Sequence, residues 1–147
     1  MRETSATFAT LLLFVTLTAL SPDVSNARAS DFQVSSLLDV PRQLRSRCAQ
    51  ESSPEAQKRC LQLTEKMSLD APALHRKFKY LDEPENEPLR RFLQVIVVGC
   101  LKQLAPKSGD SFSVQKKKLG NYFPCIEEGY LVSVRENGGE EVIRRGF

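Results

Sequence analysis

Residues 52–67 read SSPEAQKRCLQLTEKM, and this stretch decides the fold class. Ser52 is followed three residues later by Glu55, which is the pattern of a helix capping box, and Pro54 suits the first turn of a helix. One face of this helix collects apolar residues at helical spacing: Ala56, Cys60, Leu63 and Met67. The stretch therefore predicts an amphipathic helix with Cys60 on its buried side.

Two further helices are predicted downstream. Asp70 is expected to cap a helix over residues 71–81, and Pro88 is expected to open a third and more apolar helix over residues 88–104. The β-branched run at residues 92–98 leaves a strand as the alternative there, but a helical period extends through the whole segment. The expected core comprises Leu63, Met67, Leu74, Phe78, Phe92, Ile96 and Leu104.

The C-terminal third gives weaker signals. Residues 108–120 predict a short helix that is capped by Asp110 or Ser111 and stops at Gly120. Lys116 to Lys118 then fall in its last turn, where cations favour the helix dipole; the alternative is a patch for nucleic acid or heparin. Alternating residues from Tyr130, followed by Asn137-Gly138-Gly139, predict a β-hairpin near residues 130–145.

The first 29 residues have the features of a secretory signal peptide. An apolar run from Phe8 to Leu20 ends at Pro22, and Ala27-Arg28-Ala29 supplies small residues for cleavage after Ala29. The run is too short to span a bilayer, and no later segment is long enough, so we expect no membrane span after signal removal. The formal net charge of +3 is mild and by itself argues neither for nor against a polyanion partner. We expect no nucleic-acid partner.

All four cysteines follow the expected cleavage site: Cys48, Cys60, Cys100 and Cys125. An even number of cysteines in a secreted chain predicts two disulfides, and the sequence leaves their pairing open. A zinc site is the weaker alternative, because these cysteines form no close pairs and His75 is the only histidine. We therefore predict a mainly α, disulfide-stabilised single domain over residues 48–147, with no metal and no cofactor.

No recognisable catalytic motif is present in the sequence. It contains no Gly-rich phosphate loop, nucleophile elbow or zinc-protease histidine pair. Since His75 has no recognisable triad around it, acyl transfer lacks an obvious base. We therefore predict a non-enzymatic protein with no catalytic residues.

The segment before the first cysteine, VPRQLRSRC at residues 40–48, is unusually basic. A short helix that ends at Pro41 is expected just before it, and no apolar period is evident through its three arginines. We therefore predict a flexible basic lead-in over residues 30–47.

Arg42-Gln43-Leu44-Arg45 after a signal peptide resembles the RxLR motif of secreted effectors from oomycete plant pathogens. The resemblance rests on the targeting residues Arg42, Leu44 and Arg45. It implies a secreted helical effector that enters host cells and modulates host defence or cell death, and thus has a role in virulence. The alternative, which suits four cysteines, is an extracellular helical binding protein such as a cytokine-like ligand, a carrier or a venom component. In either case the expected partner is a host or extracellular protein whose identity the sequence does not give.

Overall fold

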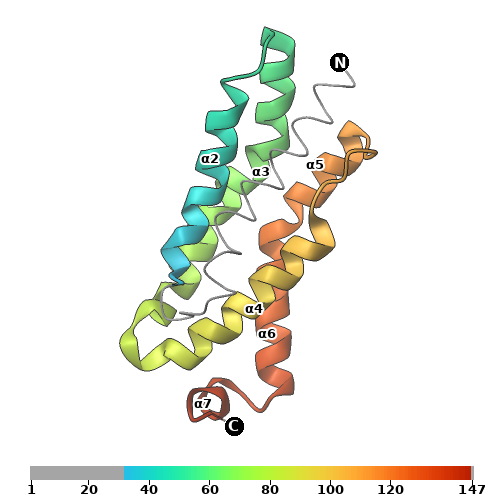
Figure 1. Cartoon of the computed structure of the whole chain (residues 1–147). Helices are drawn as coiled ribbons and strands as arrows, with labels where there is room; N and C mark the ends of the chain where they lie inside the picture. Colours follow the sequence, from blue (N-terminus) through green and yellow to red (C-terminus); the bar gives the residue numbers. More distant parts are fainter. Residues whose placement is uncertain (1–31, 147) are drawn as a thin grey trace.

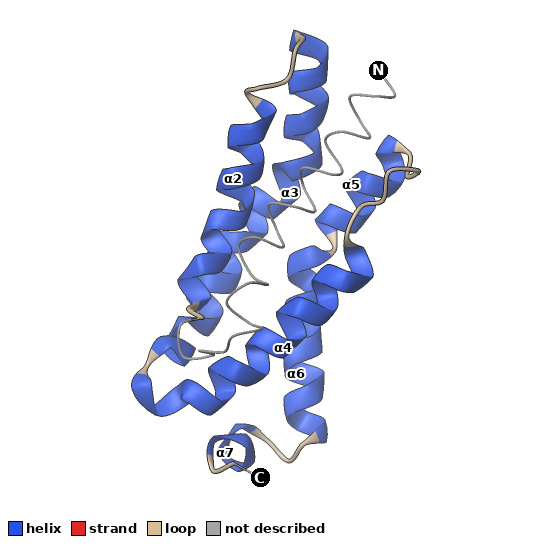
Figure 2. Cartoon of the chain, in the orientation of Figure 1, coloured by secondary structure: helices blue, strands red, loops and turns tan. Residues whose placement is uncertain are grey.

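The computed structural model describes residues 32–146, and the predicted signal peptide lies outside these residues. The described part is helical, with no strand among its elements (Figure 2). The predicted mainly α fold class is therefore confirmed. In chain order the elements are η2 (Val34–Leu38), α2 (Asp39–Cys48), α3 (Pro54–Phe78), η3 (Lys79–Asp82), η4 (Pro84–Asn86), α4 (Glu87–Leu104), α5 (Phe112–Gly120), α6 (Tyr122–Glu136) and α7 (Glu140–Arg144).

The helices pair along their lengths around one core. α2 lies beside the first half of α3, α5 packs on α3, and α4 packs on α6, while α7 closes one end of the bundle (Figure 1). None of the described helices is both long and apolar enough to cross a membrane.

α3 is longer than expected, because it joins the helices predicted over 53–67 and 71–81. Its N-cap is Ser53, one residue later than predicted, and the Ser53 hydroxyl accepts a hydrogen bond from the Ala56 amide. Pro72 lies inside the helix, where a proline removes one backbone hydrogen bond and costs about 3 kcal/mol. The helix continues because one buried stripe passes through this point: Cys60, Leu63, Met67, Ala71, Leu74 and Phe78. Asp70 pairs with Lys66 and caps nothing.

α4 confirms the predicted third helix and excludes a strand there, but its buried face is rotated from the predicted one. Leu89, Leu93, Val97, Cys100 and Leu101 are buried. The predicted core residues Phe92, Ile96 and Leu104 are only half-buried, whereas Leu63, Met67, Leu74 and Phe78 are buried as expected. The β-branched residues widen the apolar surface of this helix. The apolar period therefore does not determine which residues lie at the centre of its buried face.

The predicted C-terminal hairpin is wrong, since residues 122–136 form α6 and residues 140–144 form α7. Tyr130 and Val134 fit both a strand alternation and a helical period that begins at Phe123 and Ile126. The glycine turn is real: Gly138 and Gly139 have φ values of 95° and 106°. It connects two helices instead of two strands.

The predicted flexible lead-in does not match residues 34–48, which form η2 and α2. Pro41 was expected to end a helix, but it lies in the first turn of α2, where the missing N–H has no intrahelical partner to lose. An apolar period does pass between the arginines, through Leu37, Val40, Leu44 and Cys48, and all four residues are buried. The folded domain therefore begins before the first cysteine.

Both predicted disulfides are present, and the structure supplies their pairing. Cys48 is bonded to Cys60, which ties α2 to α3, and Cys100 is bonded to Cys125, which ties α4 to α6. No cysteine is left free. Each bridge therefore fastens one of the main helix pairs of the bundle.

Candidate functional site

The targeting residues predicted from the sequence are divided between the surface and the core. The Arg42 side chain is 73% exposed and pairs with Asp39, and Arg45 donates a 3.3 Å hydrogen bond to the Ser68 hydroxyl on α3. Leu44 is 0% exposed and belongs to the hydrophobic core. This helical turn thus exposes two arginines and buries the leucine between them.

A groove of about 600 Å³ runs between α3 and α5, and we call it the α3/α5 groove. Apolar side chains from both helices line it: Leu63, Leu69 and Phe112. Leu69 is 72% exposed, so most of this apolar side chain is accessible from solvent. The groove therefore offers apolar contact area to a molecule from outside.

Basic side chains surround this apolar floor. Lys66 comes from α3, and Lys116 and Lys117 come from α5. Lys66 pairs with Asp70 at 2.6 Å, whereas Lys116 and Lys117 have no ion-pair partner among the described residues. Glu65 is the one acidic residue in the lining. The groove therefore has a positive rim.

Local packing explains why α5 can lie so close to α3. Gly120 faces Lys66, and a Cβ atom at residue 120 would lie 3.2 Å from the Lys66 Cδ. At the other end of α5, the guanidinium of Arg59 lies 4.1 Å from the centre of the Phe112 ring, a cation–π contact. These contacts fix both walls of the groove.

The lysine run was predicted to complement the dipole of a helix that stops at Gly120, and α5 has these bounds. The Ser111 hydroxyl accepts from the Val114 amide as N-cap. The Lys107 amide donates to the Asp110 carboxylate at 2.8 Å, and Lys118 pairs with it at 2.6 Å. The amide bond first, and then the bond to Lys118, hold the pKa of the Asp110 carboxyl below its usual value. The run therefore has two parts: Lys118 forms an ion pair within the domain, and Lys116 and Lys117 line the groove.

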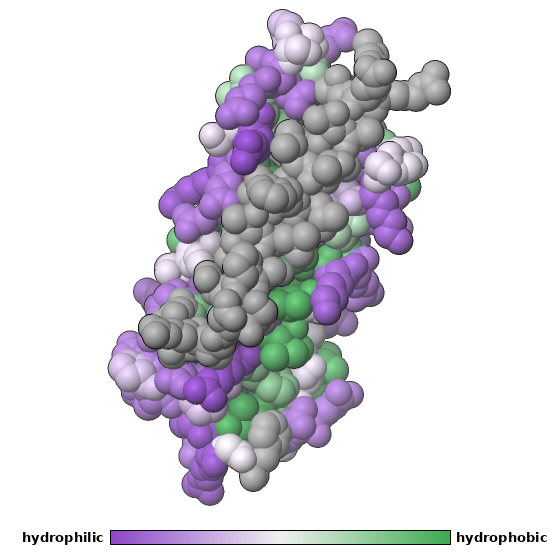
Figure 3. Space-filling view, viewed as in Figure 1, coloured by the Kyte–Doolittle hydropathy of each residue, from purple (hydrophilic) through white to green (hydrophobic). Residues whose placement is uncertain are grey.

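A second groove, of about 500 Å³, lies between α4 and α6, and we call it the α4/α6 groove. Leu104, Pro124 and Val132 line it together with Glu128, and its lining contains no basic residue. Hydrophobic residues gather on the face over these two helices (Figure 3). The two grooves thus differ in the charge beside their apolar floors.

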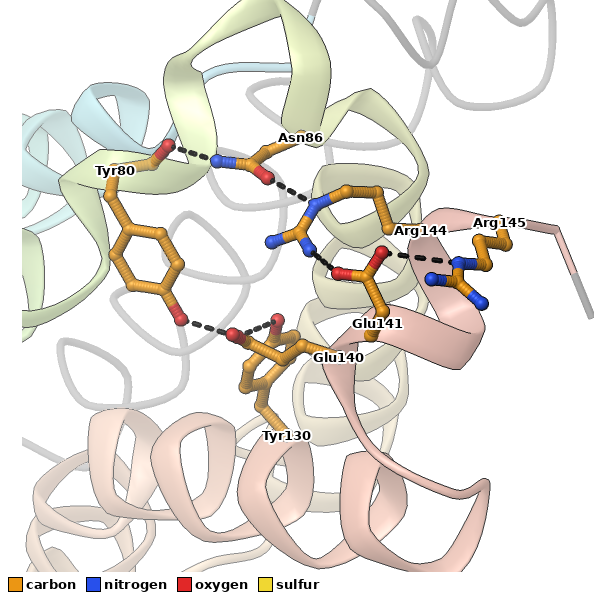
Figure 4. A network of polar contacts seen from close by, with 7 residues as sticks. All are labelled: Tyr80, Asn86, Tyr130, Glu140, Glu141, Arg144 and Arg145. Atoms are coloured by element: carbon orange, nitrogen blue, oxygen red, sulfur yellow. Dashed lines mark hydrogen bonds and ion pairs between the residues drawn. The ribbon is translucent and has the colours of Figure 1, made fainter.

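A polar network holds α7 to the rest of the bundle (Figure 4). The Glu140 carboxylate accepts hydrogen bonds from the hydroxyls of Tyr80 and Tyr130, the latter at 2.9 Å. Burial and the bond to Glu140 raise the pKa of Tyr80 to about 12, and the same causes raise the pKa of Tyr130 above its ordinary value. Both tyrosines therefore stay protonated at neutral pH, where they are hydrogen-bond donors and poor bases.

A second arm of the network runs through Arg144. Its guanidinium donates to the Asn86 side-chain oxygen at 2.9 Å and pairs with Glu141. The Asn86 amide in turn donates to the Tyr80 carbonyl at 2.8 Å. This arrangement is a latch that attaches the C-terminal helix to η3 and η4.

Sequence reasoning missed the latch and most of the α3/α5 groove. The role of Glu140 has no local signal, because the tyrosines whose hydroxyls donate to it, Tyr80 and Tyr130, lie 60 and 10 residues away in sequence. Phe112 and Leu69 were not singled out, although an exposed leucine on the polar side of an amphipathic helix is a detectable signal. Over residues 32–146, no three His, Cys, Asp or Glu side chains gather where they could share a metal ion.

Comparisons of the chain with models of known protein families, with characterised proteins and with solved structures found no match.

Proposed function

We propose that the protein acts outside the cell that makes it, as a small disulfide-bonded binding protein without catalysis of its own. The observation that carries this proposal is the placement of its two bridges. Cys48, Cys60 and Cys100 are buried, and each bridge joins helices that pack on one another. Such bridges persist in oxidising compartments and are rare in the reducing cytosol.

The energetics support the same compartment. The bridges close loops of 12 and 25 residues in sequence separation, and the chain-entropy model assigns each about 3 kcal/mol of stabilisation. That is a large share of the 5–15 kcal/mol that typically stabilises a domain. A chain that worked in a reducing compartment would forgo this contribution.

The effector function implied by the Arg42-Gln43-Leu44-Arg45 resemblance is the second candidate. In its favour, Arg42 and Arg45 lie on the exposed side of α2, within reach of a receptor. Against it, a receptor or protease that reads the leucine as well would have to unfold α2, because Leu44 is buried. For this reason we place the extracellular binding function first.

Two matched assays separate the candidates. The labelled, oxidised protein from Ser30 onward is added to intact cells, and the same chain without its signal is expressed in plant cytosol. A second cytosolic version replaces all four cysteines by alanine. We expect saturable surface binding that unlabelled protein competes away and that prior reduction abolishes. A defence or cell-death phenotype from the cysteine-free cytosolic version, without surface binding by the oxidised protein, would establish the effector function instead.

A further inference from the structure

We infer that the α3/α5 groove binds an acidic, amphipathic helical segment of a partner protein. The inference rests on the proposed function and names the chemistry of the partner. Its basis is the combination of an exposed apolar floor and a basic rim in which Lys116 and Lys117 have no ion-pair partner among the described residues.

The charge of the rim selects an acidic partner. Lys116 and Lys117 line the groove beside the single carboxylate of its lining, Glu65, while Lys66 is paired with Asp70. Arg59 adds a further cation at the Phe112 end. The α4/α6 groove has an apolar lining as well, but its charged lining residue is Glu128. An acidic segment is therefore attracted to one groove and repelled by the other.

The apolar floor selects an amphipathic segment over a merely acidic one. Leu69 and Phe112 stand on opposite walls, and Leu69 is 72% exposed. A helix that lies in the groove with leucines at i, i+3 and i+7 contacts both walls, and carboxylates on its flanks reach the lysines. α5 has nine residues, so at 1.5 Å per residue it presents a wall about 13 Å long, which matches about two turns of a bound helix.

The openness of the site disfavours a lipid chain as the occupant. Small apolar ligands are bound in cavities that bury most of their surface. Here the main apolar contact, Leu69, is largely exposed to solvent, so an acyl chain that lay along it would keep most of its surface in contact with water. A peptide helix buries only one face and leaves its polar face in water.

The test uses fluorescence anisotropy with the oxidised chain from Ser30 onward. The probe is a labelled synthetic helix with Leu at i, i+3 and i+7 positions and Glu elsewhere, and the control peptide has Lys in place of every Glu. We expect the acidic probe to bind with a strong dependence on salt and the basic peptide not to bind. Absence of binding by the acidic probe, or equal binding of both peptides, would overturn the inference.

Matched variants place the binding in the groove. The double substitution Lys116→Glu and Lys117→Glu should weaken probe binding by about tenfold or more, since two attractions become repulsions. The control, Lys79→Glu and Lys102→Glu, makes the same change of net charge at exposed lysines outside the groove and should leave affinity within about twofold. Equal losses in the two variants would mean general charge attraction and would contradict a groove site.

A second pair tests the apolar floor. Leu69→Ser should weaken binding severalfold without lowering the melting temperature, because this side chain is largely exposed already. Leu61→Ser, on the same helix but outside the groove lining, should leave affinity unchanged.

Binding to vesicles that contain phosphatidylserine tests whether the groove binds a membrane surface instead of a peptide. If the vesicles bind, the Lys116→Glu, Lys117→Glu variant abolishes that binding and the acidic probe does not bind, the occupant of the groove is a membrane surface and the peptide inference is wrong.

These outcomes are distinct from a failure of the proposed function. If the oxidised protein binds cell surfaces saturably and the Lys116→Glu, Lys117→Glu variant binds them equally well, the groove inference fails and the proposed function stands. If probe binding behaves as expected but the oxidised protein binds no cell surface, the extracellular function fails and the groove chemistry stands.

Discussion

Leu44 and Cys48 lie one turn apart on the buried face of α2, and neither side chain is exposed to solvent. Cys48 is bonded to Cys60, so this turn is fastened to α3 both covalently and by packing. The basic segment before the first cysteine is thus a structural element. Its arginines and its leucine have separate physical roles, and they can be tested separately.

Truncation of Leu44 should destabilise the protein, whereas truncation of its neighbours should not. Leu44→Ala should lower the free energy of unfolding by about 2–5 kcal/mol, as expected for a leucine removed from a packed core. Arg42→Ala and Arg45→Ala should each stay within about 0.5 kcal/mol, because both side chains are exposed. Urea unfolding of the three variants measures this, and a Leu44→Ala protein as stable as the arginine variants would show that α2 is not packed as described.

The turn between α6 and α7 depends on glycine. Gly139 has φ 106° and ψ 168°, a region that is strained for any residue with a Cβ, so Gly139→Ala should cost about 1–3 kcal/mol. Gly109→Ala is the matched control, because a Cβ there meets nothing within 4 Å and its φ is not positive; its effect should stay within about 0.5 kcal/mol. Thermal unfolding compares them. Equal melting temperatures for the two variants would contradict the helix–turn–helix arrangement.

The latch at Tyr80 predicts a loss of stability at alkaline pH. Burial, with the bond to Glu140, raises the pKa of Tyr80 from 10.0 to about 12, so the folded state favours the protonated phenol. This stabilisation is complete below the unfolded pKa of 10.0 and is lost as the pH rises through about 12. Tyr80→Phe should therefore lose less stability than the parent protein across this window.

Denaturant unfolding at a series of alkaline pH values measures this difference, and the absorbance of tyrosinate reports the titration itself. Glu140→Gln is the companion variant. It keeps a hydrogen-bond acceptor for the tyrosines and removes the negative charge, which together with burial raises the pKa of Tyr80. It should lower the tyrosine pKa values. Parallel stability curves for the parent and Tyr80→Phe would mean that the latch does not form in solution.

Each disulfide should contribute independently, because the two bridges fasten different helix pairs. Cys48→Ala with Cys60→Ala, and Cys100→Ala with Cys125→Ala, should each lower stability by about 3 kcal/mol. Alanine is the suitable replacement, since a serine hydroxyl would be buried without a certain partner. Calorimetry of the two double variants checks this, and the absence of any loss in one of them would show that the corresponding bridge does not form.

The sequence predicts those parts of the fold whose local signals agree with one another. α4 lies where a helical apolar period and an entering proline coincide, and α5 lies between its capping serine and Gly120. The even cysteine count predicts two bridges. Predictions failed where one pattern fits two structures. Tyr130 and Val134 satisfy both a strand and a helix period, and only packing against α4 decides between them.

Other failures came from giving one residue too much weight. Asp70 was expected to cap a separate helix, but the buried stripe of α3 continues past it and outweighs the one hydrogen bond that Pro72 removes. The arginines of α2 concealed the apolar period that runs between them through Leu44. The tyrosine latch was beyond prediction for a different reason: Tyr80 and Glu140 are 60 residues apart, and such a contact has no local signature.

The central claim is that the acting protein is the oxidised, extracellular form, and counting its thiols tests this claim most directly. Protein recovered from the medium of producing cells is alkylated before and after reduction and weighed by mass spectrometry. We expect no alkylation before reduction, and alkylation of all four cysteines after it, with tryptic fragments linking Cys48 to Cys60 and Cys100 to Cys125. Free thiols in the functional protein, or full activity of a form in which all four cysteines stay reduced, would contradict the account.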